Sequence, residues 1–277
     1  GFARGIARFR RNKLAVVGAA ILSIIVMLAI LAPWISPYPE DLADAVHFER
    51  LLQPPSLEYL LGTDEAGRDI LTRLLHGARL SLLTAVIVLT IAVVIGVPIG
   101  LAAGYYGGKI ETVLMRITDV FSSMPALVLA LAISVVMGAD LLHSMIAIGL
   151  VWWRGFARIA HGRAISLKQE SYVVVARMLG ASDLHIMFRE ILPNMASPLL
   201  VTISLDAGYA ILIGTAISFL GAGANPPTAE WGLMIASGRH YLPDQWWPSL
   251  FPGLAIFVTV LSFNLLGDGL RDFFGED

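Results

Sequence analysis

The sequence contains no cysteine and little charge. Of its 277 residues, 14% are Asp, Glu, Lys or Arg and 57% are hydrophobic, whereas soluble domains carry about 25% charged residues. The missing cysteines exclude disulfide bonds and thiolate metal sites. The formal net charge of −2 gives no reason to expect nucleic acid as a partner. This composition is that of an integral membrane protein.

The sequence also lacks the motifs that would make it an enzyme by itself. The nearest approach to a phosphate-binding loop lies at 104–109, but Ala103 stands where the Walker pattern needs glycine, and Ile110 follows the lysine. The histidines have no HExxH spacing, and no GxSxG elbow occurs. We therefore expect a non-catalytic chain without a cofactor or metal of its own.

Long apolar stretches predict membrane-spanning helices. A helix needs about 20 apolar residues to cross a bilayer core, and uninterrupted runs of that length are too long for the strands of a barrel. We expect an all-α polytopic membrane protein with six transmembrane helices, at approximately 14–33, 80–103, 115–137, 141–160, 197–220 and 249–268.

The distribution of Lys and Arg predicts the orientation. The N-terminal stretch RGIARFRRNK is strongly basic, which favours a cytoplasmic N-terminus. Six spans then return the C-terminus to the cytoplasm, place 161–196 on the cytoplasmic side, and leave 34–79 and 221–248 outside. The basic residues left outside are Arg50, Arg68, Arg73, Arg79 and Arg239.

The segment 171–194, SYVVVARMLGASDLHIMFREILPN, is rich in ionisable residues although apolar runs lie on both sides. It predicts a helix, a break from Gly180 to Asp183 with a new N-cap, a second short helix and a stop at Pro193. A helical pair that projects from the membrane suits insertion into a groove on a partner protein. Its apolar anchor is expected from Tyr172, Val175, Met178 and Leu179, and its polar rim from Arg177 and Asp183.

Small and polar residues inside the spans indicate where helices meet. Gly96, Gly100 and Gly104 form a GxxxGxxxG stripe, which predicts close helix packing, with a moving transporter interface as the alternative. Charged and amide side chains in hydrocarbon usually face a cavity or a partner. Asp206 and Asn264 are therefore candidates for a translocation path, and structural pairing stays open for Asp206.

Several blocks carry a resemblance to a known family. Gly180 and Leu192-Pro193 resemble the glycine and Leu-Pro of the coupling motif in binding-protein-dependent ABC importer permeases. Val174 and Val175 depart from its Glu-Ala. The segment 172–182 is similar to the peptide branch of that family. Further similarity lies in LGTDEAGRDILTRLLHGARLSL, AISFLGAGANPPTAEWGLMIASGR and FNLLGDGLRD.

Together these blocks resemble the C-type permease subunit of dipeptide and oligopeptide importers over essentially the whole chain. The resemblance implies a type I ABC importer permease fold in a bacterial plasma (inner) membrane, with residues 1–79 as N-terminal tail, first span and external loop, and 80–277 as the core domain. It implies four kinds of partner: a homologous permease, one or two ATPase subunits that bind ATP and Mg, an extracytoplasmic binding protein, and membrane lipid. The implied coupling residues are Tyr172, Val175, Ala176, Arg177, Met178, Leu179, Gly180, Ala181, Ser182, Asp183, Leu192 and Pro193.

Three classes of function compete at this point. An importer permease needs a separate ATPase and a cytoplasmic docking helix, a secondary transporter works alone and usually carries inverted repeats, and an intramembrane enzyme needs catalytic groups in the bilayer. The docking segment and the resemblance favour the first class. Peptide is the expected substrate, with nickel or glutathione as alternatives on the same fold.

Overall fold

The computed structural model describes residues 2–275, which are mostly helical and contain no strand. The elements are α1 (Phe2–Arg11), α2 (Lys13–Ile35), η1 (Pro39–Leu42), η2 (Phe48–Arg50), α3 (Ile70–Tyr106), α4 (Gly108–Ser123), α5 (Ala126–Met137), α6 (Leu141–Leu167), α7 (Ser171–Met178), α8 (Asp183–His185), the π-helical η3 (Ile186–Ile191), α9 (Leu192–Asn194), α10 (Ala196–Phe219), α11 (Trp231–Gly238), η4 (Arg239–Tyr241) and α12 (Trp247–Phe274).

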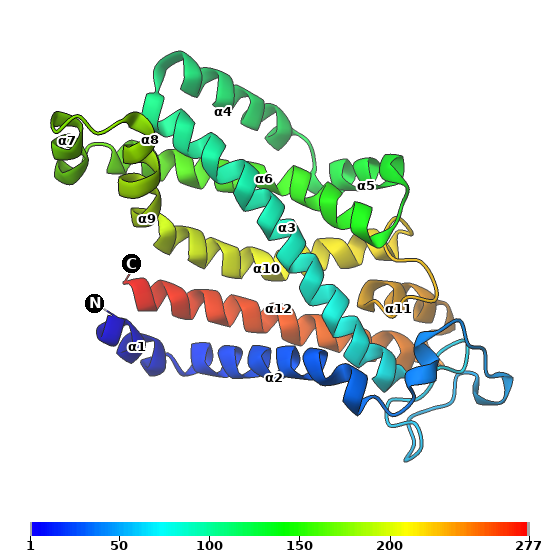
Figure 1. Ribbon diagram of the computed structural model, residues 1–277. Coiled ribbons are helices and arrows are strands. Elements are labelled where there is room, and N and C mark those ends of the chain that lie inside the picture. The colour runs from blue at the N-terminus through cyan, green and yellow to red at the C-terminus, as the bar shows by residue number, and fades with distance from the viewer. Residues whose placement is uncertain (1, 276–277) are drawn as a thin grey trace.

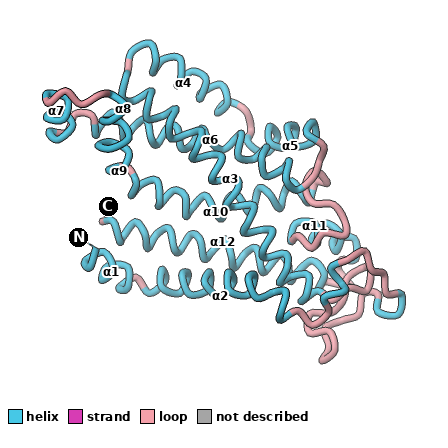
Figure 2. Tube along the Cα trace, viewed as in Figure 1, coloured by secondary structure: helices cyan, strands magenta, loops and turns pink. Residues whose placement is uncertain are grey.

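The long helices form a bundle with two different ends (Figure 1). Helices α2, α12, α10 and α6 lie next to one another, and α3 crosses them diagonally. Both termini lie at the same end of the bundle as α7 and α8, whereas α11 and the segment between α2 and α3 lie at the opposite end. Loops gather at that opposite end (Figure 2).

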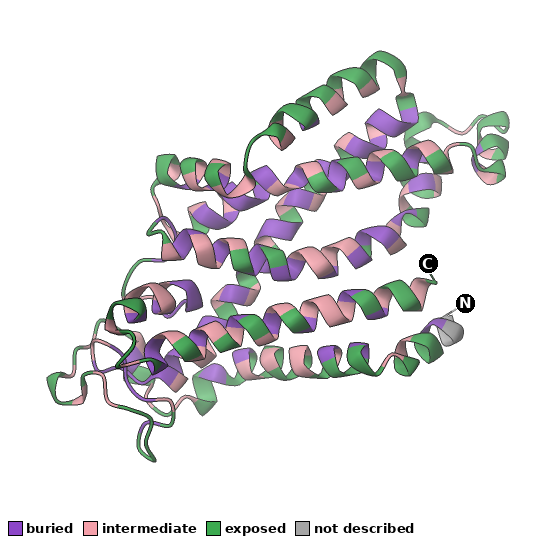
Figure 3. Ribbon diagram, turned by 180° about the vertical axis from the view of Figure 1, so that it is seen from behind, coloured by how far each residue is buried: buried purple, intermediate pink, exposed green. Residues whose placement is uncertain are grey.

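The glycine stripe of α3 packs directly on α6, which confirms the predicted close helix packing. A Cβ atom added to Gly104 would lie 2.6 Å from the backbone oxygen of His161, and Cβ atoms on Gly96 and Gly100 would collide with the backbone oxygens of Trp153 and Ala157. Larger side chains at the stripe would force the two helices apart. The buried face of α6 therefore points toward α3, and its exposed residues lie on the other side (Figure 3).

The third expected span is not one helix. The prediction of a single helix over 115–137 is wrong, because α4 and α5 meet at an angle of 89°. Pro125 stands at the break as the N-cap of α5, and proline has no N–H to continue the hydrogen bonding of α4. The carbonyl of Phe121, which a helical residue 125 would have bonded, instead accepts a hydrogen bond of 2.8 Å from Arg154 Nη1.

By length and composition, four helices in the described part of the chain can cross a membrane, or five if the bent pair counts as one. These are α2, α3, α10 and α12. Helix α6 is long enough but carries Arg154 and Arg158, so the number six remains a prediction. Helix α3 begins at Ile70, well before the expected residue 80, so the predicted domain boundary at 79/80 falls inside it.

Candidate functional site

The expected helical pair is present in 171–194, and its turn has a defined hydrogen-bonding pattern. After α7 the N–H of Ala181 donates to the carbonyl of Ala176 (3.1 Å), and the N–H of Gly180 donates to the carbonyl of Arg177 (3.0 Å). These are the two bonds of a Schellman motif, which needs a left-handed residue after the helix. Gly180 supplies it, with φ of +84°. The Ser182 side chain then accepts from the N–H of His185 and caps α8.

The outer surface of this segment is strongly apolar. Met178 is 81% exposed and Leu179 is 83% exposed at the end of α7, and Val175 is also exposed. Such side chains in water favour a protein partner that covers them. Further exposed apolar side chains, which the sequence reading did not single out, are Val174, Leu184 and Phe188.

Other residues of the segment face inward and attach it to the bundle. Val173 is fully buried, and Tyr172 packs against the hydrophobic core instead of joining the exposed surface. The Tyr172 hydroxyl is buried without a hydrogen-bond partner. Burial raises the pKa of Tyr172, and Glu170 and Glu190 raise it further. The segment is therefore a fixed projection with one apolar outer surface.

The projection is tied to the end of α3. Tyr105 donates a hydrogen bond of 2.6 Å to Asp183 Oδ1, and the guanidinium of Arg177 lies over the Tyr105 ring, 5.6 Å from its centre. Lys168 Nζ also donates to the backbone oxygen of Gly104 (2.8 Å). The two residues expected on the polar rim thus face α3, a contact that no local sequence pattern indicates.

The remaining expected coupling residues have structural positions near the turn. Ala176 and Ala181 are partly buried against the core, which fits the apolar contact that accompanies a Schellman motif. Leu192 and Pro193 form α9, directly after η3. The segment α8–η3–α9 is thus a continuous helical stretch that leads into α10.

The two path candidates lie on different helices. On α10, Asp206 Oδ2 accepts a hydrogen bond of 3.0 Å from Trp152 Nε1 of α6. On α12, Asn264 donates to the backbone oxygen of Val260 in its own helix (3.0 Å). A separate apolar groove of about 800 Å³ lies between α2, α3, α10 and α12, and neither candidate lines it. Asp206 and Asn264 are thus not brought together in this groove.

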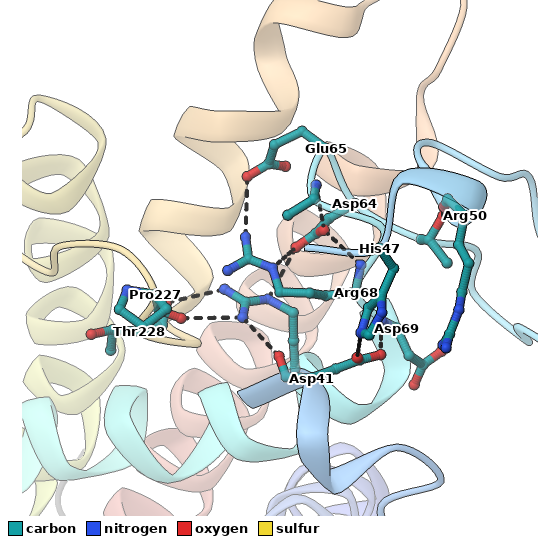
Figure 4. A network of polar contacts seen from close by, with 12 residues as sticks. Asp41, His47, Arg50, Asp64, Glu65, Arg68, Asp69, Pro227 and Thr228 are labelled. Atoms are coloured by element: carbon teal, nitrogen blue, oxygen red, sulfur yellow. Dashed lines mark hydrogen bonds and ion pairs between the residues drawn. The ribbon is translucent and has the colours of Figure 1, made fainter. Parts of the chain in front are cut away.

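The opposite end of the bundle carries a cluster of buried charges (Figure 4). Asp64 Oδ2 lies 2.8 Å from Arg68 Nε and 3.3 Å from Arg73 Nε. Asp41 accepts hydrogen bonds of 2.8 Å from the backbone N–H of Asp69 and from His47 Nε2. Burial raises the pKa of Asp69, which caps the start of α3. These contacts fold the segment between α2 and α3 onto the start of α3. This folded segment is called the cap below.

The start of α3 also contacts α11 and the segment before it. Arg73 donates to the backbone oxygens of Pro227 (3.1 Å) and Thr228 (3.3 Å). Trp231 Nε1 donates to the backbone oxygen of Leu74 (3.0 Å). Two sequence blocks that are far apart in the chain therefore form one surface at this end. Sequence reasoning had no signal for this pairing, since neither block contains a pattern that names its neighbour.

Comparison with protein families gives matches to both parts of the chain. Residues 96–276 match the family described as binding-protein-dependent transport system inner membrane component. Residues 2–55 match the N-terminal transmembrane domain of oligopeptide transport permease C. The first match includes the projecting segment and the path candidates.

Curated proteins of similar sequence match this chain over most of its length and over most of their own. A putative peptide transport system permease of Brucella abortus is 43% identical over 265 residues, which are 96% of this chain and 88% of that protein. A probable D,D-dipeptide transport system permease of Escherichia coli K12 is 41% identical over 94% of this chain and 87% of its own length. A glutathione transport system permease of Pectobacterium atrosepticum is 39% identical over 96% and 87%.

Among solved structures, a chain of the MetNI methionine ABC transporter in an inward-facing conformation is similar in fold. The TM-score is 0.56 at 19% sequence identity, with 73% of this chain and 96% of that chain covered. At this identity the likeness concerns the arrangement of the helices alone.

Proposed function

The chain belongs to the family of inner membrane components of binding-protein-dependent transport systems, and from this premise we propose that it carries peptides across the membrane as half of a heteromeric permease. It is a non-catalytic, multi-pass permease subunit of an ABC importer with the type I permease fold. Such importers work with ATPase and substrate-binding partners. Peptide is the proposed substrate because relatives that are 43% and 41% identical to this chain are described as peptide and dipeptide permeases.

The single observation that supports ATPase coupling is the projecting segment 171–194. It presents exposed Met178 and Leu179 at the end of the bundle where both termini lie. An apolar helix end with charged neighbours fits a groove on another protein. We place this end in the cytoplasm, in agreement with the basic N-terminal tail. A secondary transporter would not need this surface.

The other partners follow from the two ends of the molecule. The cap around Asp64 and the segment before α11 form the outer surface that an extracytoplasmic binding protein would approach. A homologous permease completes the translocation path, to which Asp206 and Asn264 contribute. ATP and Mg are bound by the ATPase subunits. The core from α3 onward then does the transport work, and the residues before α3 add the first span and the cap.

Purification with an affinity tag on this chain tests the assembly. We expect a second permease and one or two ATPase subunits to co-purify, and the reconstituted complex to transport alanyl-alanine only with ATP and a binding protein. Transport by a homodimer without any ATPase would contradict the proposal. Failure to transport peptides by an assembled, ATP-hydrolysing complex would contradict the substrate only.

Cysteine labelling tests the orientation, since the chain has no cysteine of its own. Ser182→Cys lies in the projecting segment and Thr228→Cys lies beside the cap. In intact cells a membrane-impermeant maleimide should label Cys at 228 and should reach Cys at 182 only after the membrane is opened. The reverse pattern would overturn the orientation.

A further inference from the structure

An ion pair joins α4 to α6, about one turn before the end of α4. Arg158 Nη2 is 2.9 Å from Asp119 Oδ1, and the two side chains are 55% and 57% exposed. Arg158 is more than two helical turns from the end of α6, and Asp119 is about three turns from the start of α4. Charged side chains at such positions face a water-filled space or a protein partner instead of lipid.

The surface of α6 is open at the two glycines on either side of Arg158. Gly155 and Gly162, one turn before and one turn after Arg158, are exposed, and an added Cβ atom on either would meet nothing within 4 Å. The side of α6 that packs on α3 carries Ala157 and His161 instead. The backbone of another molecule can therefore approach α6 closely at Arg158.

The neighbouring arginine has a different role. Arg154 donates to the carbonyl of Phe121 that the break before α5 releases, and it thereby joins the last turn of α4 to α6. The pair with Asp119 uses one nitrogen of the Arg158 guanidinium and one carboxylate oxygen. A guanidinium has five N–H donors and binds carboxylates in a two-pronged manner. Arg158 thus keeps donors for a second carboxylate.

We propose that Asp119 and Arg158 form a transient binding site for the charged ends of a short peptide on the translocation path. The peptide carboxylate binds the remaining donors of Arg158, and Asp119 accepts a hydrogen bond from the peptide ammonium. In the empty carrier the two side chains neutralise each other. This site rests on the proposed peptide transport, and it adds the residues that recognise the ends of the substrate.

The test uses the complete importer in proteoliposomes, with alanyl-alanine and its C-terminal amide as probes. Arg158→Gln should lower the initial rate for alanyl-alanine at least about tenfold, because a charge-assisted contact is lost, and should change the rate for the amide less than about twofold. Asp119→Asn should lower the initial rate for alanyl-alanine by a similar factor. It should change the rate for N-acetyl-alanyl-alanine, which has no ammonium group, less than about twofold. Arg10→Gln, an exposed arginine of α1, is the matched control and should change none of these rates.

A double variant separates binding from structure. Asp119→Asn with Arg158→Gln removes both charges together and leaves neither one unpaired, so transport of alanyl-alanine should stay low while the ATPase subunits still co-purify. Wild-type rates in this double variant, unchanged rates in Arg158→Gln, or equal losses for blocked and unblocked peptides would each overturn the site. The wild-type rate tests the proposed function separately. A wild-type complex that moves no peptide would overturn that function and this site with it.

Discussion

The hydroxyl of Tyr105 donates a hydrogen bond of 2.6 Å to the carboxylate of Asp183, which joins the last turn of α3 to the first residue of α8. Helix α3 runs without interruption from Ile70 to Tyr106, and at its other end Arg73 holds the segment before α11. A displacement of the projecting segment would therefore act directly on a helix that reaches the cap at the opposite end of the bundle.

Removal of the Tyr105 hydroxyl should weaken this connection without loss of the ring. Tyr105→Phe retains the contact with Arg177 and removes a hydrogen bond to a charged, partly exposed acceptor, worth about 1 kcal/mol. We expect wild-type assembly with the ATPase subunits and a severalfold fall in peptide transported per ATP hydrolysed. Asp183→Asn retains an acceptor and is the milder control. Equal coupling ratios in Tyr105→Phe and wild type would show that this contact carries no coupling.

The effect of a substitution at Gly180 should depend on how readily the new residue adopts a positive φ, and not on the size of its side chain. Its φ is +84° and an added Cβ would meet no atom within 4 Å, so the cost of a side chain is backbone strain alone. Valine, which is β-branched, should cost more than about 1 kcal/mol there, whereas asparagine adopts this conformation more readily. We expect Gly180→Val to insert in the membrane but to lose ATPase co-purification and substrate-stimulated hydrolysis, and Gly180→Asn to retain most of both.

If Gly180→Val and Gly180→Asn were equally active, the Schellman turn would not set the direction of the helical pair. If both lost the same activity, side-chain volume at an interface would be the better explanation. The two variants thus distinguish a turn that orients the segment from a surface that contacts the ATPase.

Val175 tests the docking surface itself. The side chain is 52% exposed, so Val175→Asp should leave the isolated chain folded but place a charge against an apolar groove, which costs several kcal/mol without a partner. We expect at least tenfold weaker ATPase binding, measured by retention of the ATPase subunits during purification. Val175→Thr has nearly the same shape and should lose far less. Wild-type retention in Val175→Asp would mean that 171–194 is an ordinary loop.

The sequence predicted the parts of the fold that depend on local composition. The stripe of Gly96, Gly100 and Gly104 predicted close packing, and the contacts with α6 confirm it. The break from Gly180 to Asp183 and its new N-cap, which the structure assigns to Ser182, follow from short-range backbone chemistry, so they too could be predicted. The resemblance to importer permeases was confirmed by the family match over 96–276.

Predictions based on hydropathy alone were less accurate where tertiary contacts replace lipid. Helix α3 begins ten residues before the expected start, because Asp69 is its N-cap residue and Arg73 forms an ion pair with Asp64 of the cap. In a prediction from hydropathy, a charged residue such as Arg73 normally argues against a span. The run 115–137 is apolar enough as a whole to resemble one span, although it bends by 89° at the break between α4 and α5. The contact between Arg73 and Pro227 joins residues 154 positions apart, and no pattern within either block could show it.

The bend before α5 leads to the last prediction, which concerns Arg154. Because Pro125 has no N–H, the guanidinium of Arg154 is the donor to the carbonyl of Phe121. Arg154→Leu should leave that carbonyl unsatisfied and lower the stability of the chain by about 1–3 kcal/mol, seen as a lower unfolding temperature of the purified complex in detergent. Arg116→Leu, which removes an exposed arginine of α4, should have little effect.

A second substitution shows whether the lost hydrogen bond is the cause. Pro125→Ala restores an N–H at the position that a helix would use to bond the carbonyl of Phe121. In this background Arg154→Leu should cost less than it does in the wild type, because the carbonyl then has another donor. Additive losses in the double variant would instead show that Arg154 stabilises the chain through its charge or its packing. The bend and the arginine would then be independent features of the fold.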